Sequence, residues 1–525
     1  MWTIITFVGF TGFVALVSWW FTRGDEMIDS DAYFLGGRTL TAWVIAGSLM
    51  LTNLSTEQLI GLNGDAFQHT IAVMAWETTA ALAMVATALY FLPRYMKSGF
   101  ATIPQFLGER YDEHTRVIAT CLFLASYVLA ILPVVLLFGA TALESLFDVS
   151  ENLGLSTGAA ITMMVWSIGT LGSLYAIFGG LKAVAISDTV NGAGFLVAGL
   201  LVPVLALIYV GDGSMMAGLT EVYTEEHEKF DITGDEPGSF LPFGVLFTGM
   251  IVNQVFFWCT NQSIVQRALG AKSLAEGQKG VLIAASLKLV GPLIIVLPGV
   301  IAFHMFKDTM GPEDYLQAYP TLVKTVLPPA LLGFFAAVMV GAVLSTFNSV
   351  LNSSATLFSQ GIHYTLINRN ATGRQLVFSG RVVSIVLALA AMIAAPMLNT
   401  TGSLYVYLQK INATFFGPML AVILLGFLTK RVPPLAAKVG LVCGPIMYFI
   451  LVFFFEENVH FLHLLAIVFL VVAAVMLVIG RLWPQDADFV QKETDDVDVT
   501  PWRYAVPAGA TICVATIVCY LLLAQ

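Results

Sequence analysis

Long apolar segments alternate with short polar loops along the whole chain. Each segment is close to the roughly 20 residues that a helix needs to cross the hydrocarbon core of a bilayer. The pattern therefore predicts an all-α polytopic membrane protein with about 14 transmembrane helices. The apolar segments span residues 2–21, 41–62, 70–92, 117–146, 157–178, 188–210, 241–258, 280–303, 327–358, 382–398, 403–428, 436–455, 460–480 and 504–523.

The second apolar segment is interrupted by a polar patch, Leu51–Gln58. Six of its eight residues are polar, and one of them, Glu57, carries a carboxylate. A charged group in mid-membrane costs about 2.5 kcal/mol or more, and polar groups there need partners. We therefore predict a broken helix whose backbone oxygens and side chains face a buried cavity. The alternative is a seam between helices that is held together by Ser, Thr and Asn.

The seventh segment carries a second polar interruption, Asn253 and Gln254, followed by Phe257 and Trp258. Interruptions in the second and seventh segments indicate an inverted repeat with two discontinuous helices at a binding site. We expect a single transmembrane domain over residues 1–525. Its predicted parts are an extra N-terminal helix (2–21), a first repeat (41–210), a second repeat (241–428) and three extra C-terminal helices (436–525).

Polar side chains of the right kind for a polyhydroxylated ligand occur inside several segments. The amides, the carboxylate and the ammonium in question are those of Gln58, Glu77, Asn253, Gln254, Lys288 and Gln409, and nearby aromatic faces are those of Trp76, Phe257 and Trp258. Apolar walls with a few placed polar groups are typical of a binding pocket. Two alternatives remain open: Glu77 and Lys288 form a buried ion pair that only joins helices, and the aromatic rings face lipid.

Two adjacent hydroxyl residues, Ser345 and Thr346, lie in the ninth segment. Together with backbone carbonyls from a broken helix, their oxygens would make a cage suited to a hard monovalent cation. The alternative is that each hydroxyl bonds back to the carbonyl four residues earlier in its own helix, which is common for Ser and Thr.

Composition and charge narrow the class of protein. The chain is 58% hydrophobic and only 11% charged, with a mean hydropathy of +0.84, whereas about a quarter of the residues in a soluble protein are charged. The net charge of −10 and the lack of a basic stripe exclude a nucleic-acid partner. The spacing of the five cysteines indicates neither a disulfide framework nor a metal site. No phosphate-binding loop points to ATP as the energy source.

The distribution of Lys and Arg predicts the orientation. If residue 1 lies outside, the inner loops carry 19 of the 24 basic residues, with Arg267 counted among them, and the outer loops carry 3. This asymmetry is a strong positive-inside signal. We expect a multi-pass protein of the bacterial inner membrane with both termini on the periplasmic side and the lipid bilayer as its surroundings.

Four stretches of the sequence resemble a known family. They are Asp31–Arg38, Ser55–Gln58, Ala268–Gly280 and Phe347–Ser353. The chain resembles the sodium:solute symporters, and among them the bacterial sodium/galactose symporters, over nearly its whole length. The resemblance implies a LeuT-like 5+5 inverted repeat with discontinuous helices that works by alternating access.

The resemblance also implies site residues. The expected Na⁺ ligands are the backbone oxygens of Leu51, Leu54 and Ala342 and the hydroxyls of Ser345 and Thr346. Sugar contacts carry over to Asn53, Gln58, Glu77, Lys288 and Gln409. Asp188 matches an acidic residue on the sodium exit route, and together with Ser345 and Asn348 it is a candidate second Na⁺ site.

The chain departs from the sodium/galactose pattern at several of these places. Ala80 stands where the galactose transporter has a sugar-contacting Ser, and Gln254, with Asn253 beside it, replaces a sugar-binding Asn. Phe257 replaces the Tyr that gates the sugar, which keeps the ring and loses the hydroxyl. Sodium coupling is therefore better supported than the identity of the sugar.

The resulting hypothesis is a sodium-coupled secondary active symporter, not an enzyme, that imports a neutral monosaccharide similar to galactose or glucose. Na⁺ is then the co-transported ion. A related alternative is a sodium-coupled carrier of another solute, such as a cyclitol or a sugar acid. An alternative of a different class is a membrane sensor with a degenerate transporter fold, whose expected mark is a long cytoplasmic effector domain.

Overall fold

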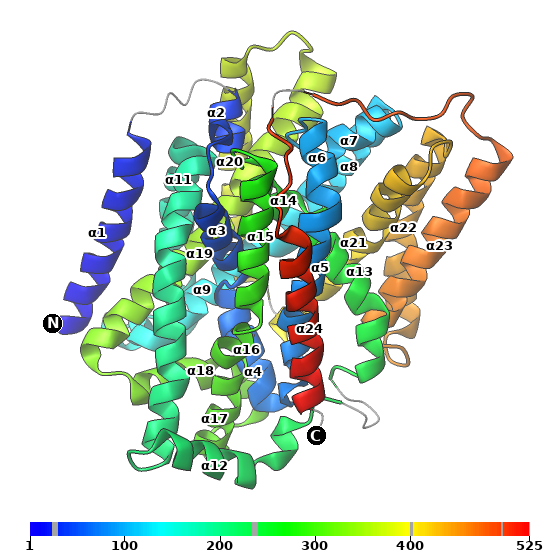
Figure 1. Ribbon diagram of the computed structural model, residues 1–525. Helices are drawn as coiled ribbons and strands as arrows, with labels where there is room; N and C mark the ends of the chain where they lie inside the picture. The colour runs from blue at the N-terminus through cyan, green and yellow to red at the C-terminus, as the bar shows by residue number, and fades with distance from the viewer. Residues whose placement is uncertain (24–29, 234–239, 399–402, 495–496, 524–525) are drawn as a thin grey trace.

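The computed structural model describes residues 1–23, 30–233, 240–398, 403–494 and 497–523, and this part of the chain contains helices and loops and no β-strand. The helices form one bundle whose longest members run roughly parallel to each other (Figure 1). Both ends of the chain lie toward the end of the bundle that carries α12 (Met215–Glu225) (Figure 1).

The predicted break in the second apolar segment is confirmed. The segment forms two half-helices, α3 (Ala42–Asn53) and α4 (Thr56–Gln68), with Leu54 and Ser55 between them. Polar groups at the break bond to α19 (Pro329–Leu357) and not to their own helix: the Thr52 carbonyl accepts from the Thr346 hydroxyl and the Ser55 hydroxyl donates to the Ala342 carbonyl. Glu57 lies in the first turn of α4, where the positive end of the helix dipole stabilises a carboxylate.

The seventh segment is broken as well. It forms α13 (Gly249–Cys259) and α14 (Gln262–Leu269). Asn261 caps α14, since its side-chain oxygen accepts hydrogen bonds from the Ser263 N–H at 3.1 Å and from the Tyr127 hydroxyl at 2.7 Å. An Asn at this position satisfies free N–H groups at the start of a helix, so the sequence itself positions the second break.

A third break lies in the eighth segment, where a continuous span over 280–303 was expected. The chain forms α15 (Leu274–Lys288), then α16 (Gly291–Ile295) and α17 (Leu297–Phe306), with a bend of 50° between α15 and the later pair. Pro292 follows Gly291 in the first turn of α16. A proline there cannot extend α15, because it lacks the N–H that would bond the Lys288 carbonyl. Lys288 consequently ends a helix.

The count of fourteen spans is not confirmed. In the described residues, eleven helices are long and apolar enough to cross a membrane, and the bent pair adds a twelfth. The first and second broken segments do not pass that test, because α3 and α13 are each half a span long. The fifth and sixth segments belong to α11 (Thr157–Val210), which Gly180 divides by a positive φ of 61°.

The other helices surround these broken elements. Those of the bundle are α5 (Ala75–Ala86), α6 (Leu92–Lys97), α7 (Ile103–Arg110), α8 (Glu113–Ser126), α9 (Leu132–Phe147), α19 (Pro329–Leu357), α20 (Gly373–Ala394) and α21 (Leu404–Leu428). The short ones are α2 (Ser30–Leu35), α10 (Val149–Leu153) and α18 (Tyr315–Val326). The peripheral ones are α1 (Trp2–Thr22), α22 (Pro434–Phe455), α23 (Phe461–Leu482) and α24 (Ala505–Leu523).

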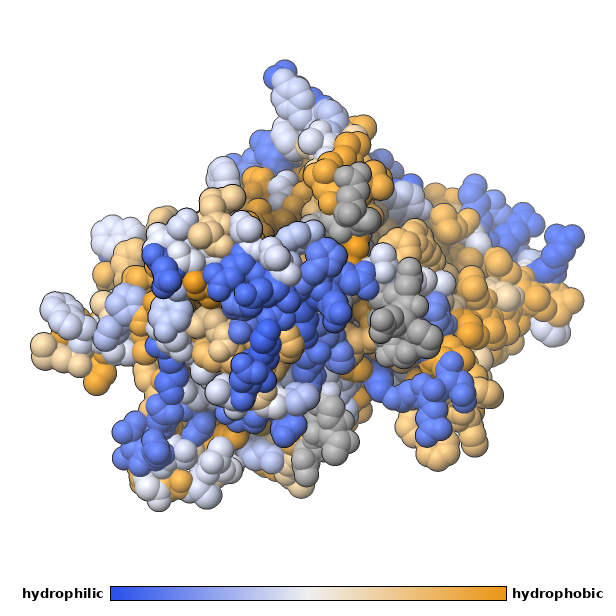
Figure 2. Space-filling model, turned by 90° about the horizontal axis from the view of Figure 1, so that it is seen from below, coloured by the Kyte–Doolittle hydropathy of each residue, from blue (hydrophilic) through white to orange (hydrophobic). Residues whose placement is uncertain are grey.

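The surface matches a protein that is surrounded by lipid. Large apolar side chains such as Trp2, Phe449 and Phe453 are exposed on the peripheral helices. Seen from the end with α12, hydrophilic residues gather over the middle of the molecule and apolar residues are frequent toward its edge (Figure 2). Helix α19 packs against α1, α3, α9 and α11 at the centre of the bundle, so its polar residues are buried.

Candidate functional site

A cavity of about 60 Å³ lies where the two broken segments meet α19 and α21. Both breaks contribute side chains to its wall, and the longer helices complete it. The polar and aromatic residues that line the cavity are Thr52, Asn53, Glu57, Gln58, Trp76, Asn253, Gln254, Phe257, Trp258, Ser263, Thr346, Tyr405, Gln409 and Asn412. The cavity thus has the composition of a site for a small polar ligand with apolar faces.

Most of the predicted solute contacts meet at this cavity. Those that line it are Asn53, Gln58, Asn253, Gln254, Phe257 and Gln409. Two of their amides are held in place: the Gln254 amide donates to the Trp76 carbonyl at 2.7 Å, and the Gln409 amide donates to the Tyr405 hydroxyl at 2.8 Å.

Polar atoms in the cavity wall are left without protein partners. Among the residues that the structure describes, the Gln58 side-chain carbonyl, one Glu57 carboxylate oxygen and the Trp76 ring N–H are buried and form no hydrogen bond. Buried polar groups usually have partners. Unpaired donors and acceptors around one cavity therefore indicate a bound polar ligand or water.

Glu77 and Lys288 are not part of the cavity wall. Their side chains form an ion pair at 2.6 Å, with exposures of 1% and 0%. The Lys288 ammonium also donates to the Asn53 side chain and lies 5.1 Å from the centre of the Trp258 ring. Since Asn53 and Trp258 do line the cavity, the ion pair supports the wall from behind, in the geometry of the helix-joining alternative.

Tyr405 lines the cavity and is absent from the predicted site. Its ring packs edge-on against Trp76, with the ring centres 5.7 Å apart. It lies one helical turn before Gln409 on α21, and residues four apart share a helix face. That spacing is a signal from which Tyr405 could have been found.

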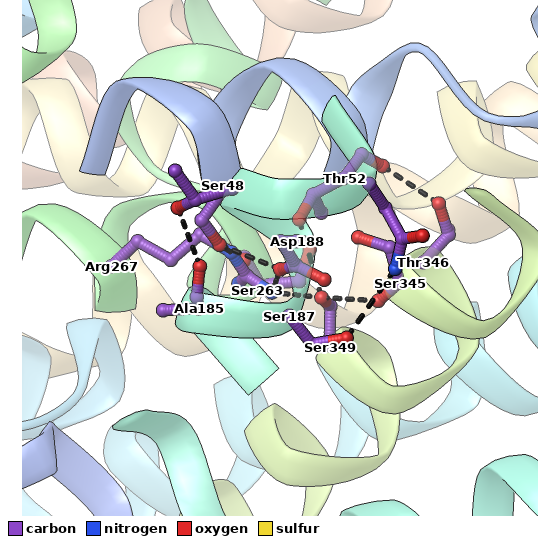
Figure 3. Close-up of polar contacts among 12 residues, drawn as sticks. Ser48, Thr52, Ala185, Ser187, Asp188, Ser263, Arg267, Ser345, Thr346 and Ser349 are labelled. Atoms are coloured by element: carbon purple, nitrogen blue, oxygen red, sulfur yellow. Dashed lines mark hydrogen bonds and ion pairs between the residues drawn. The ribbon is translucent and has the colours of Figure 1, made fainter. Parts of the chain in front are cut away.

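Ser345 and Thr346, the two hydroxyl residues predicted to bind Na⁺, lie close to Thr52, which precedes the first break (Figure 3). Thr346 on α19 donates its hydroxyl to the Thr52 carbonyl at 2.9 Å, and the Ser55 hydroxyl reaches the Ala342 carbonyl at 3.5 Å. Helix α19 is therefore fastened to both sides of the break. Ser345 is buried, and within the described parts of the chain its hydroxyl has no hydrogen-bond partner.

The break also releases two of the three predicted backbone ligands, Leu51 and Leu54, from the helical ladder. In a continuous helix the Ser55 N–H would bond the Leu51 carbonyl, but it bonds the Asn53 carbonyl at 2.8 Å. Likewise the Gln58 N–H bonds the Ser55 carbonyl at 3.1 Å rather than that of Leu54. Carbonyls outside the ladder are the oxygen ligands that discontinuous helices offer to ions.

Asp188 and Asn348, the candidates for a second cation, point to different neighbours. Asp188 on α11 is buried and accepts a hydrogen bond from the Ser48 hydroxyl at 2.7 Å. Asn348 turns its amide oxygen toward Gly172, where it lies 3.1 Å from the position that a Cβ would occupy. Arg267, which the charge distribution predicts to lie in an inner loop, is fully buried on α14, and its Nη2 lies 3.8 Å from Oδ2 of Asp188.

Comparisons with known proteins place these features in context. The sodium:solute symporter family model matches residues 33–444. The uncharacterized symporter YidK of Escherichia coli is 47% identical over 523 residues, which is 99% of this chain and 91% of that protein. The sodium/glucose cotransporter of Vibrio parahaemolyticus is 29% identical over 467 residues, or 84% of this chain and 83% of that one.

A solved structure shares the fold. It is the substrate-bound, outward-open state of a Na⁺-coupled sialic acid symporter, with a TM-score of 0.78 over 94% of this chain and 99% of that one. The two sequences are 20% identical, so the likeness concerns the LeuT-like helical fold and not the solute.

Proposed function

Since the chain belongs to the sodium:solute symporter family, we propose that it imports a neutral monosaccharide together with Na⁺ by alternating access. Sodium-coupled symport, with Na⁺ as the co-transported ion and without enzymatic activity, follows from the family itself. The family does not give the identity of the solute. We propose that the solute is uncharged and similar to galactose or glucose.

The chemistry of the cavity wall carries this proposal. Its described polar side chains are amides and hydroxyls with a single carboxylate, Glu57, and no ammonium or guanidinium group lines it. The dipole of α4 offsets the Glu57 charge. Amides can donate to and accept from sugar hydroxyls, and the rings of Trp76, Phe257 and Trp258 offer flat faces to its C–H groups.

The Lys288–Glu77 pair argues against an anionic solute such as a sugar acid. The Lys288 ammonium lies behind the cavity wall, and Glu77 neutralises it at 2.6 Å. A carboxylate that entered the cavity would meet Glu57 without a free cation to pair with. At an effective dielectric near 20, such repulsion amounts to a few kcal/mol.

The same arrangement couples the solute to sodium. Asn53 faces the cavity and stands between Leu51 and Leu54, whose carbonyls are the predicted Na⁺ ligands. An ion that fixes these carbonyls also fixes the Asn53 side chain and so completes the solute site. Linkage of this kind is reciprocal, because the solute must then raise the affinity for Na⁺ by the same factor.

We also propose that the protein lies in the bacterial inner membrane with both termini periplasmic. The asymmetry of Lys and Arg supports this orientation. Cysteine-scanning with a membrane-impermeant thiol reagent at both termini tests it: labelling in intact cells supports the orientation, and labelling only after lysis contradicts it.

A thermal-shift screen of the purified protein tests the solute. A ligand of the folded state raises the unfolding temperature by mass action. We expect a neutral hexose to raise it in Na⁺ but not in K⁺. A cyclitol or a sugar acid that raises it more than every neutral hexose would overturn the proposal.

Two variants make the screen specific to the cavity. Gln58→Leu removes an unpartnered amide that faces the cavity, so we expect it to abolish the sugar-dependent shift. Gln278→Leu serves as the matched control, since Gln278 is buried away from the cavity and bonds the Ala88 carbonyl at 3.0 Å. It should lower the melting temperature and keep the sugar-dependent shift.

A further inference from the structure

A cavity of about 500 Å³ lies between α3, α15 and α24, and it shares no lining residue with the solute cavity. Helix α15 packs against both α3 and α24, and the three helices lie next to one another in the bundle (Figure 1). The volume falls within the roughly 300–1,000 Å³ of small-molecule sites. The protein therefore has room for a second ligand outside the solute cavity.

One end of this cavity lies at the surface of the membrane. Helix α24 has 19 residues, which is close to the length that crosses the hydrocarbon core, so Trp502 just before it lies at the level of the lipid headgroups. Trp43 in the first turn of α3 is 72% exposed. Both indole rings line the cavity, and tryptophan is enriched where membrane and water meet. The two rings therefore mark the headgroup level at the mouth of the cavity.

The lining changes from charged to apolar along one face of α15. Glu276 and Lys279 lie at the charged end, and Leu282 and Ile283 follow about one turn later. Ile512 of α24 adds to the apolar part. Residues three or four apart share a helix face, so the charged and apolar parts form one continuous surface. A phospholipid has the same order of a charged headgroup and an apolar chain.

The charges at the mouth form an ion pair with unused hydrogen-bonding capacity. Lys279 Nζ lies 3.1 Å from Glu276 Oε1, and the two side chains are 36% and 18% exposed. The other Glu276 oxygen accepts the Ala42 N–H at 2.9 Å. An ammonium has three donors and a carboxylate has about four acceptor sites. Within the described part of the chain, the pair therefore keeps donors and acceptors for a ligand.

The charges around this mouth are nearly balanced. Glu276 and Lys279 cancel each other. Lys272, just before α15, and Asp498, whose carbonyl accepts from the first N–H of α15 at 2.8 Å, add one charge of each sign. The Arg503 guanidinium lies against the ring of the next residue, 4.4 Å from its centre. Such a site has little net attraction for an anion, but it offers a zwitterion a partner of each sign.

We propose that this cavity binds a zwitterionic phospholipid with a primary ammonium, such as phosphatidylethanolamine. The phosphate accepts from Lys279, the headgroup ammonium donates to Glu276, and an acyl chain fills the apolar part between α15 and α24. Because Glu276 also holds the first N–H of α3, the headgroup adjoins the half-helix that ends at the first break. The bound lipid therefore steadies the half-helix that carries Leu51 and Asn53.

Native mass spectrometry of the full-length protein tests the proposal. The protein is purified from vesicles with equal amounts of phosphatidylethanolamine, phosphatidylglycerol and phosphatidylcholine, and the lipids that stay bound are counted. We expect phosphatidylethanolamine to be retained about three- to tenfold more often than either other lipid, because partly exposed charge contacts contribute modestly. Phosphatidylglycerol lacks the ammonium, and phosphatidylcholine lacks the N–H donors for Glu276.

A charge-removing variant makes the test specific to the mouth. Glu276→Gln keeps an acceptor for the Ala42 N–H and leaves Lys279 without its counter-charge, so the preference should move to phosphatidylglycerol. A purely structural role of Glu276 would not change which lipid is preferred. Asp112→Asn is the matched control, because Asp112 pairs with Lys438 at 2.6 Å, is 30% exposed and does not line the cavity. It should keep the wild-type preference.

A second variant tests the apolar part of the cavity. Thr511 is exposed on α24 and lines the cavity, so Thr511→Trp fills the space for the chain without altering a charge. We expect this variant to lose the retained phosphatidylethanolamine.

Other outcomes overturn the proposal. Equal retention of the three lipids by the wild type, or a preference for phosphatidylglycerol, contradicts it, and so does an unchanged preference in folded Glu276→Gln. If Glu276→Gln does not fold, Thr511→Trp decides: loss of the bound lipid supports the proposal, and wild-type retention contradicts it. Because neither Na⁺ nor a sugar is added, failure of the sugar screen leaves these results unaffected.

Discussion

Among the residues that the structure describes, two ion pairs are buried on both sides, and they differ in construction. Lys288 and Glu77 are in direct contact at 2.6 Å and join α15 to α5. Arg267 and Asp188 stand 3.8 Å apart, and the Ser48 hydroxyl connects them. Each pair lies beside a broken helix, the first behind the solute cavity and the second next to the predicted sodium site.

The difference shows how a membrane protein can keep charges near a site without offering them to the ligand. The Lys288–Glu77 pair neutralises itself, so its role at the cavity is to hold Asn53 and the Trp258 ring in place. The Arg267–Asp188 pair spreads its charges over a network of hydroxyls, which ties it to the helix that carries Ser345 and Thr346. One pair supports the cavity wall, and the other joins α14 to α3, α11 and α19.

The largest expected effect concerns the hydroxyls of Ser345 and Thr346, which lie beside this second network. Replacing both Ser345 and Thr346 with Ala should raise the Na⁺ concentration needed for uptake by at least about a hundredfold, since hydrogen bonds and contacts to charged groups contribute about 1.5–3 kcal/mol each. Uptake into reconstituted vesicles over a range of Na⁺ concentrations measures it. Ser354→Ala is the control, because Ser354 lies on the same helix, is buried and only bonds the Val350 carbonyl. An unchanged sodium dependence of the double variant would contradict the assignment of Ser345 and Thr346 to the sodium site.

Separating the tight pair should cost stability. Lys288→Met leaves Glu77 buried without its cation, and breaking a buried pair destabilises a protein by about 3–5 kcal/mol. Lys288→Met together with Glu77→Leu removes both charges and should recover most of that loss. Denaturation in detergent compares the three proteins. A double variant as unstable as the single one would mean that the pair contributes through its packing rather than its charge.

Removing the charge of Glu77 alone should also change which solutes the protein transports. Glu77→Gln leaves the Lys288 ammonium beside Asn53 without a counter-charge. We expect uptake of neutral sugars to weaken by roughly tenfold or more, because a charge-assisted hydrogen bond contributes about 1.5–3 kcal/mol and its loss disturbs the Lys288 ammonium that holds Asn53 at the cavity. We also expect sugar acids to become substrates. Competition against labelled hexose reads both effects. If hexose uptake is unchanged and sugar acids remain excluded, the pair has no part in selecting the solute.

The breaks show what the sequence could predict of the fold. The polar patch Leu51–Gln58 is long enough to mark a discontinuous helix by composition alone. Hydropathy does not predict the bend after Lys288, because the neighbouring residues are apolar. Gly291 and Pro292 nevertheless mark the bend through their backbone chemistry. The fourteen apolar segments are not all single full-length helices, because hydropathy counts a pair of half-helices as one continuous segment.

The site was predictable by residue type but not by the direction of each side chain. Glu77 and Lys288 were correctly expected inside the protein, yet whether they face the cavity or each other depends on the rotation of α5 and α15, which no local pattern fixes. Arg267 was counted with the loops because it follows a polar stretch. Its burial depends on Asp188, which lies far away in the sequence.

Removing the Tyr405 hydroxyl at the cavity should have a smaller effect than changing either ion pair. Tyr405→Phe keeps the ring that packs against Trp76 and removes the oxygen that accepts from the Gln409 amide at 2.8 Å. A neutral hydrogen bond contributes about 0.5–1.5 kcal/mol, so KM for the sugar should rise about two- to tenfold while the Na⁺ dependence stays unchanged. Uptake kinetics at saturating Na⁺ measure this. A change in Na⁺ affinity of equal size would place Tyr405 in the coupling network instead.

The smallest expected effect concerns Lys229, which lies outside the membrane-spanning segments and differs from both buried ion pairs. Its ammonium donates to the Phe67 carbonyl at 2.6 Å and lies 3.8 Å from the centre of the Phe303 ring, without a carboxylate in direct contact among the described residues. Loss of solvent lowers the pKa of Lys229 from 10.5 to about 8. The unfolded chain therefore binds more protons between these values, and stability rises with pH across that window.

The destabilising contribution of Lys229 is fully present below pH 8 and disappears above pH 10.5. We expect the thermal midpoint of the wild type to rise by a degree or two more between pH 7.5 and pH 10 than that of Lys229→Met. Lys324→Met is the matched control, because Lys324 is also outside the spans and pairs with Asp148 at 2.7 Å; it should keep the wild-type pH profile. A pH profile of Lys229→Met that is identical to that of the wild type would show that the charge of Lys229 does not destabilise the folded protein.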